Sequence, residues 1–124
     1  MNNTVLEATK QHYALVFYSG RTLSAEELKQ REVAIAAWVN QVTGMGIWLD
    51  PRSLARTAAT LSPEGDQVVT RKEPNDPKLS TIVFFDSPSS ELALEIAGMH
   101  PGVQYGATVE VREWTSPREA AAKG

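Results

Sequence analysis

The chain contains no cysteine, only two histidines and no long hydrophobic run. Without cysteine it has no disulfides, thiolate metal ligands or cysteine nucleophiles, which fits a reducing compartment, and we expect a cytoplasmic protein. The longest apolar run, residues 81–85, is far shorter than the roughly 20 residues that a membrane-spanning helix needs. Residues 1–10 also lack the basic and apolar regions of a signal peptide. We therefore expect no membrane association.

Strong charge and cofactor motifs are also missing. The net charge is −3, with no Lys/Arg block, so we expect no nucleic-acid partner. Neither histidine has carboxylates at metal-ligand spacing, and there is no glycine-rich phosphate loop or serine nucleophile elbow. We therefore expect no metal and no cofactor. What remains is a chain of 124 residues, 42% of them hydrophobic, which suffices for one domain with a single core.

The first half of the chain predicts a strand followed by a long helix. The run HYALVFYSG (12–20) is apolar on both faces, which is typical of a central strand. A helix is predicted over 21–44, because Ser24 and Glu27 have the spacing of a capping box. Its apolar positions recur on one face, and they are Leu28, Ile35, Val39 and Val42, with Trp38 beside them.

The second half predicts shorter elements. These are a hairpin with arms at 57–61 and 67–70, an exposed charged loop over 71–80, a buried strand over 81–85, a helix over 86–100 and an alternating strand over 106–114. Ser87 is expected to cap the second helix, with Pro88 at its first position. The polar segments 1–11 and 115–124 are expected to be flexible, which leaves 12–114 as one domain.

This order predicts an α+β fold of the ferredoxin-like β-α-β-β-α-β type with an extra hairpin. Its antiparallel sheet would carry two helices on one face and leave the other face bare. Several strands are apolar on both sides, so a bare face would be a large exposed apolar patch. We therefore expect a homodimer in which the two sheets pack against each other.

Together, the segments over about 12–114 resemble the YCII-related proteins, a family of dimeric α+β barrel domains. The opening HYALVFYSG and the closing HPGVQYGATVEVRE carry most of the resemblance. Many members of the most similar branch have an Asp-Gly-Pro-Phe motif after the hairpin, where this chain reads TRKEPNDPK (70–78). Another branch has a catalytic His–Asp pair with the histidine early in the first helix, where this chain has none. The resemblance thus implies a dimeric barrel, but neither of those sites.

Two residues are candidates for catalysis. His100 is expected at the end of the second helix, where an imidazole can act as a general acid or base or bind an anion. The alternative is that it only stabilises the helix C-terminus. Asp86 ends a buried strand, so it could orient His100 or bind a substrate, but an aspartate at that place is also ordinary helix-capping chemistry.

The last strand supplies candidates for substrate binding. Glu110 and Arg112 fall on one face, together with Thr108 and Trp114, and that face should be the bare side of the sheet. Arg112 could bind a carboxylate bidentately, or it could form an ion pair that sets the register of the dimer. Tyr18 and Trp48 could line a cavity in the barrel, or belong to the core or interface.

Two classes of function stay open. One is a cofactor-free enzyme for a small organic acid, in which Arg112 holds the carboxylate and His100 or Asp86 moves a proton. Its lyase-, isomerase- or dehalogenase-like chemistry is an analogy with the superfamily. The other is a non-catalytic dimeric module that binds a ligand or regulates. An enzyme should have a solvent-connected cavity that holds a base together with Arg112, whereas a binding protein needs no base in reach.

Overall fold

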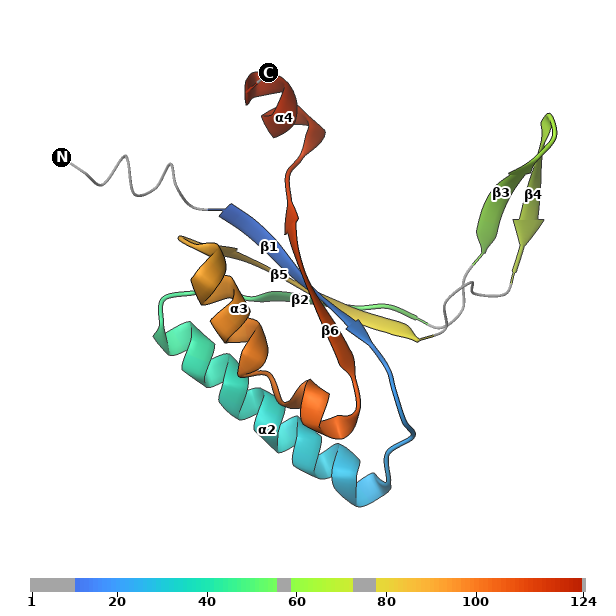
Figure 1. Cartoon of the computed structure of the whole chain (residues 1–124). Helices are drawn as coiled ribbons and strands as arrows, with labels where there is room; N and C mark the ends of the chain where they lie inside the picture. Colours follow the sequence, from blue (N-terminus) through green and yellow to red (C-terminus); the bar gives the residue numbers. More distant parts are fainter. Residues whose placement is uncertain (1–10, 56–58, 73–77, 124) are drawn as a thin grey trace.

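The chain folds into an α+β domain with antiparallel sheets and three α-helices among the residues that the computed structural model describes, which are 11–55, 59–72 and 78–123. Figure 1 shows the arrangement. In chain order the elements are β1 (Gln11–Tyr18), α2 (Ala25–Gly44), β2 (Asp50–Ser53), β3 (Thr60–Glu64), β4 (Gln67–Arg71), β5 (Leu79–Ser87), α3 (Ser90–Gly98), the 3₁₀-helix η1 (Pro101–Tyr105), β6 (Thr108–Trp114) and α4 (Pro117–Lys123).

The main sheet has four strands in the order β2-β5-β1-β6. All neighbouring strands are antiparallel, and α2 and α3 lie on the same side of the sheet (Figure 1). The apolar run at the start of the chain does form a central strand, because β1 pairs with β5 on one side and β6 on the other. The predicted α+β class is confirmed, and the strand order is compatible with a ferredoxin-like plan.

The core lies between this sheet and the two helices. Alternate residues of β1, namely Tyr13, Leu15 and Phe17, point to the helix side and are buried, as the two-residue period of a strand requires. Trp38 of α2 is buried among them, and its indole Nε1–H donates to the carbonyl of Ile96 in α3 at 2.9 Å. This bond ties the two helices together above the sheet.

The side of the sheet away from α2 and α3 is called the open face below. The strand register places His12, Ala14, Val16 and Tyr18 of β1 on it, since residues directly opposite each other on paired strands share a face. Ile82, Phe84 and Asp86 of β5 and Thr108, Glu110, Arg112 and Trp114 of β6 lie opposite them. The open face therefore has an apolar centre with polar residues around it.

The helix ends are set by serines, although not always by the predicted one. Ser24 caps α2, and both hydrogen bonds of the capping box with Glu27 are present, as predicted. α3 begins later than expected, because Ser89 is its cap and accepts from the amide of Leu92 at 3.1 Å. Ser87 is instead the buried last residue of β5, and its hydroxyl donates to the carbonyl of Ser89 at 2.8 Å.

The hairpin β3–β4 turns at Gly65, whose φ of 63° is in the left-handed region that favours glycine. It projects away from the sheet and helices (Figure 1). Residues 56–58 and 73–77 lie outside the described residues, and they include the start of the predicted first arm and half of the predicted loop. Residues 1–10 of the predicted flexible segment lie outside them too.

The segment that we expected to be a flexible tail contains α4. Its start is capped by Ser116, whose hydroxyl accepts from the amide of Glu119 at 3.1 Å. In the described part of the chain, no helix is both long and apolar enough to cross a membrane.

Candidate functional site

A cavity of about 620 Å³ lies on the helix side of the sheet, between α2 and the strands. Residues from β1, α2, β2, β5 and η1 line it. This volume falls within the range of about 300–1,000 Å³ that is usual for small-molecule sites. The cavity is therefore the first place to look for a ligand.

The cavity explains why the apolar positions that recur on one face of α2, called its apolar stripe below, are only half buried. Leu28, Ile35 and Val39, which were predicted to share one face of the helix, line the cavity, and Leu28 and Val39 are exposed. Only Trp38 and Val42 of this stripe are fully buried. The helix thus packs closely through its C-terminal half, while its N-terminal half presents apolar side chains to an open space.

Arg31 lies in the same stripe, one turn after Leu28 and one turn before Ile35, and it also lines the cavity. Its Nε is buried and has no hydrogen-bond partner among the described residues. A buried N–H without a partner costs about 1–3 kcal/mol, and more when the group is charged. Most buried polar atoms in folded proteins are satisfied, so this nitrogen calls for an explanation.

His100 also lines the cavity. It does not end a helix, as the sequence suggested, because α3 stops at Gly98 and His100 is the N-cap of η1. Its Nδ1 accepts a hydrogen bond from the amide of Gly102 at 2.8 Å. A β-carbon at Gly102 would lie only 2.9 Å from Nδ1, so a glycine is needed for this close approach.

The environment of His100 keeps its ring neutral. The ring centroid lies 4.5 Å from that of Phe17 and 4.6 Å from that of Trp38. Burial, and then the positive charge of Arg31, lower the pKa of His100 from 6.5 to about 4. Because Nδ1 accepts from an amide, the single proton of the neutral ring is on Nε2. At neutral pH His100 is therefore a hydrogen-bond donor and has no free nitrogen to accept a proton.

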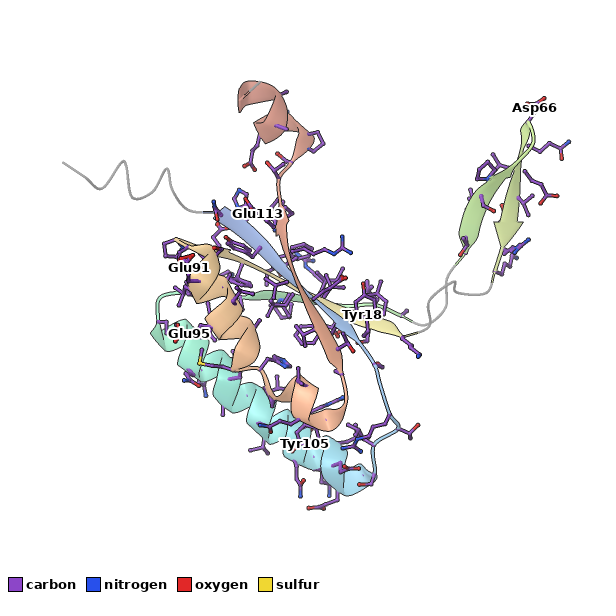
Figure 2. The ribbon with its side chains drawn as sticks, in the orientation of Figure 1. Tyr18, Asp66, Glu91, Glu95, Tyr105 and Glu113 are labelled. Atoms are coloured by element: carbon purple, nitrogen blue, oxygen red, sulfur yellow. The ribbon has the colours of Figure 1, made fainter. Side chains whose placement is uncertain are left out.

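A second arginine lies at the edge of the cavity. Arg21 lines it, and its guanidinium pairs with Glu27 at 2.9 Å. The hydrogen bond from Arg21, and then the bond from the Ser24 amide, lower the pKa of Glu27 to about 2. Figure 2 places Tyr105, another lining residue, where η1 meets α2. The described lining thus contains two guanidinium groups, one imidazole and several hydroxyls, but no carboxylate.

The residues predicted to bind a substrate lie elsewhere. Glu110 and Arg112 are on the open face, where the Arg112 Nε donates to Glu110 at 2.9 Å and its Nη2 donates at 3.3 Å. The Tyr18 hydroxyl donates to the same carboxylate at 3.0 Å. These bonds lower the pKa of Glu110 and raise that of Arg112. The structure therefore joins these three residues into one paired cluster, away from the cavity.

Asp86 and Trp48 are also separated from His100. Asp86 lies on the open face and its carboxylate receives the Nδ1 proton of His12 at 2.6 Å, so it does not orient His100. Trp48 follows α2 and is 81% exposed, and it is not among the residues that line the cavity. His100 and Arg112 are therefore not brought together, and His100 shares the cavity with Arg31 instead.

Arg31 is the candidate site residue that our reading of the sequence missed. A signal for it was present, since an arginine at position 31 interrupts the apolar positions 28, 35, 38 and 42 on one helical face. A charged residue on a face that should be buried indicates a partner or a ligand.

Comparison of the sequence with models of known protein families and with curated proteins finds no match. Within the described residues, no group of three or more histidine, aspartate or glutamate side chains is arranged to hold a metal ion. The cavity therefore has to be interpreted from its own chemistry.

Proposed function

We propose that this protein is a small-molecule-binding domain that takes an organic acid with an apolar or aromatic body into the cavity beside α2. The observation that carries this proposal is the buried Nε of Arg31, which has no partner among the described residues. A ligand carboxylate would accept this proton, and it could take a second one from the same planar guanidinium.

His100 supports the same ligand class. Its Nε2–H is a second donor in the cavity, since Nδ1 is already occupied by the amide of Gly102. Phe17 and Trp38 contact the imidazole and also line the cavity. An apolar or aromatic body would pack on these rings, while its carboxylate meets Arg31 and His100. The apolar part supplies affinity and the two donors select an anion.

The same chemistry favours binding over proton transfer. A general base needs a lone pair within hydrogen-bond reach of the substrate, but the described lining has no carboxylate and the ring of His100 offers an N–H. A second candidate follows from that N–H, because a neutral histidine can polarise a substrate carbonyl as an electrophile. That candidate is an enzyme of the lyase or isomerase type, and its substrate or a neighbouring molecule would have to supply the base.

The open face is proposed to pack against a second copy of the chain. Its centre contains Ala14, Val16, Ile82 and Phe84, and paired charges surround them: Glu110 with Arg112, and Asp50 with Arg52 at 3.1 Å. An apolar centre with a polar rim is the usual anatomy of an interface. A monomer by light scattering at tens of micromolar protein would contradict this pairing of two chains.

Membership of the YCII-related family and a cytoplasmic location stay predictions.

The ligand proposal is tested by thermal shift with benzoate and phenylacetate, beside the neutral amides benzamide and phenylacetamide. An acid at about 100 times its Kd stabilises the folded state by about 2.7 kcal/mol. We expect a shift with the acids and a much smaller one with the amides. The shift should disappear in Arg31→Met and persist in Arg112→Met, which removes the same charge from the open face.

The opposite pattern would refute the site. If Arg112→Met abolished the shift and Arg31→Met kept it, the carboxylate would bind on the open face, as the sequence alone suggested. Equal shifts with acids and amides would mean that the cavity takes apolar molecules without selecting an anion.

A further inference from the structure

The other histidine, His12, lies near the start of β1, whereas the cavity is lined by residues from the end of that strand onward. The proposed ligand does not involve it. His12 is the second residue of β1 and lies on the open face between two carboxylates from different elements. Its Nδ1 is 2.6 Å from Oδ1 of Asp86 in β5, and its Nε2 is 3.0 Å from Oε2 of Glu119 in α4. The ring also stacks on Trp114 of β6, with centroids 4.5 Å apart and planes at 21°.

This geometry specifies the charge of the ring. An ionised carboxylate accepts hydrogen bonds and donates none, so each ring nitrogen that meets one must carry a proton. Only the imidazolium form has protons on both nitrogens. The neutral ring can serve one carboxylate and leaves the other facing a lone pair. The face of Trp114 also favours a cation stacked on it.

Among the described residues, the bond between His12 and Glu119 is the only hydrogen bond or ion pair that joins α4 to the sheet. α4 has seven residues, and its described side chains other than Glu119 are exposed. The first turn is held by Ser116, which is local to the helix. A helix of this length is not stable on its own in water, so its position depends on this contact.

We propose that His12 is a proton-operated latch, which in its charged form binds Asp86 with one ring nitrogen and Glu119 with the other, and thereby docks α4 at the end of the open face. When the ring loses one proton, the remaining N–H stays in the shorter bond to Asp86, at 2.6 Å against 3.0 Å, so the bond to Glu119 breaks and the helix is released. The groups around the ring are the carboxylates of Asp86 and Glu119 and the indole of Trp114. The next cation along β6 on this face, Arg112, is paired with Glu110.

The titration of His12 sets the pH dependence of the latch. The hydrogen bond to Asp86 raises the pKa of His12 above 6.5, burial opposes this effect, and the bond to Glu119 adds to it. A raised pKa means that the contact stabilises the folded form fully below pH 6.5, and that this contribution is lost as the pH rises through the higher folded value. α4 is thus docked at low pH and released at high pH.

The test is a pH titration from 5 to 9 by NMR, and with two histidines in the chain the ring signals are readily assigned. Long-range ¹H–¹⁵N spectra report the protons on each ring nitrogen of His12, and the ¹⁵N heteronuclear NOE of residues 117–123 reports whether α4 is docked. We expect both nitrogens to be protonated below a midpoint above 6.5, and the NOE to fall through the same midpoint.

Three variants complete the experiment. Glu119→Gln keeps a capping residue at the start of α4, and it should move the midpoint of His12 toward 6.5 and leave α4 mobile at every pH. His12→Gln should leave α4 mobile without any pH dependence. Glu113→Gln removes the same charge from the other face of β6 and should change neither reading.

Any of three results would overturn the latch. They are a midpoint of His12 at or below 6.5 in the unmodified chain, an order of α4 that does not follow the titration of His12, and an unchanged midpoint in Glu119→Gln.

Discussion

Replacing Arg31 by methionine should stabilise the protein in the absence of ligand, although it removes the residue that we propose is needed for binding. Methionine keeps an unbranched stem of similar length, and the two residues have similar helix propensities. The substitution removes the buried Nε–H, which has no partner among the described residues. Relief of such a group is worth about 1–3 kcal/mol, which corresponds to a rise in Tm of roughly 3–12 °C for a chain of this size.

Arg112→Met is the matched control for this prediction. The Nε of Arg112 donates to Glu110 at 2.9 Å, and its side chain is 64% exposed. An exposed ion pair contributes little to stability, because solvent screens it, so the stability of this variant should be unchanged or slightly lower. The two substitutions make the same chemical change, but only Arg31→Met should increase the free energy of unfolding.

Urea and thermal unfolding, followed by circular dichroism, measure both variants. Arg31→Met should also raise the pKa of His100, since the charge of Arg31 contributes to lowering it. A loss of more than about 1 kcal/mol in ligand-free Arg31→Met would refute the reasoning, because it would mean that the guanidinium already makes bonds worth more than its burial costs.

Two further predictions concern stability. Between pH 6.5 and about 4 the unfolded chain binds a proton at His100 that the folded chain does not. The free energy of unfolding should therefore decrease by up to about 3 kcal/mol as the pH is lowered through this window. His100→Asn keeps an acceptor for the amide of Gly102 and has no imidazole to titrate. Its free energy of unfolding should decrease less over the same window, as urea unfolding at several pH values would show. Gly20→Ala should cost at least about 1–3 kcal/mol, because its β-carbon would lie 1.8 Å from the carbonyl oxygen of Gly106, whereas Gly98→Ala meets nothing within 4 Å and should gain about 0.5–1 kcal/mol. Equal unfolding free energies for these two alanine variants would contradict the packing at Gly20.

Local patterns in the sequence predicted most of the fold correctly. The two-residue and 3.6-residue periods depend only on which side chains avoid water, and they identified β1, α2 and β6. Ser24 and Glu27 are close in the chain, so their capping box was readable as well. Ser87 and Ser89 compete for the start of α3 within three residues, and the choice between them depends on where β5 ends, which pairing with β1 decides.

The sequence by itself determined that this is an α+β domain with a central apolar strand, two amphipathic helices and two histidines as the main titratable groups near neutral pH. Only the tertiary structure decided which groups meet. Because successive residues of a strand point to opposite faces, Asp86 and His12 meet on the open face. On the other side of the sheet, Arg31 and His100 line the same cavity. The members of these two pairs lie 74 and 69 positions apart, and no local pattern encodes their proximity. Both pairings depend on the strand register and on how α2 packs against the sheet around the cavity.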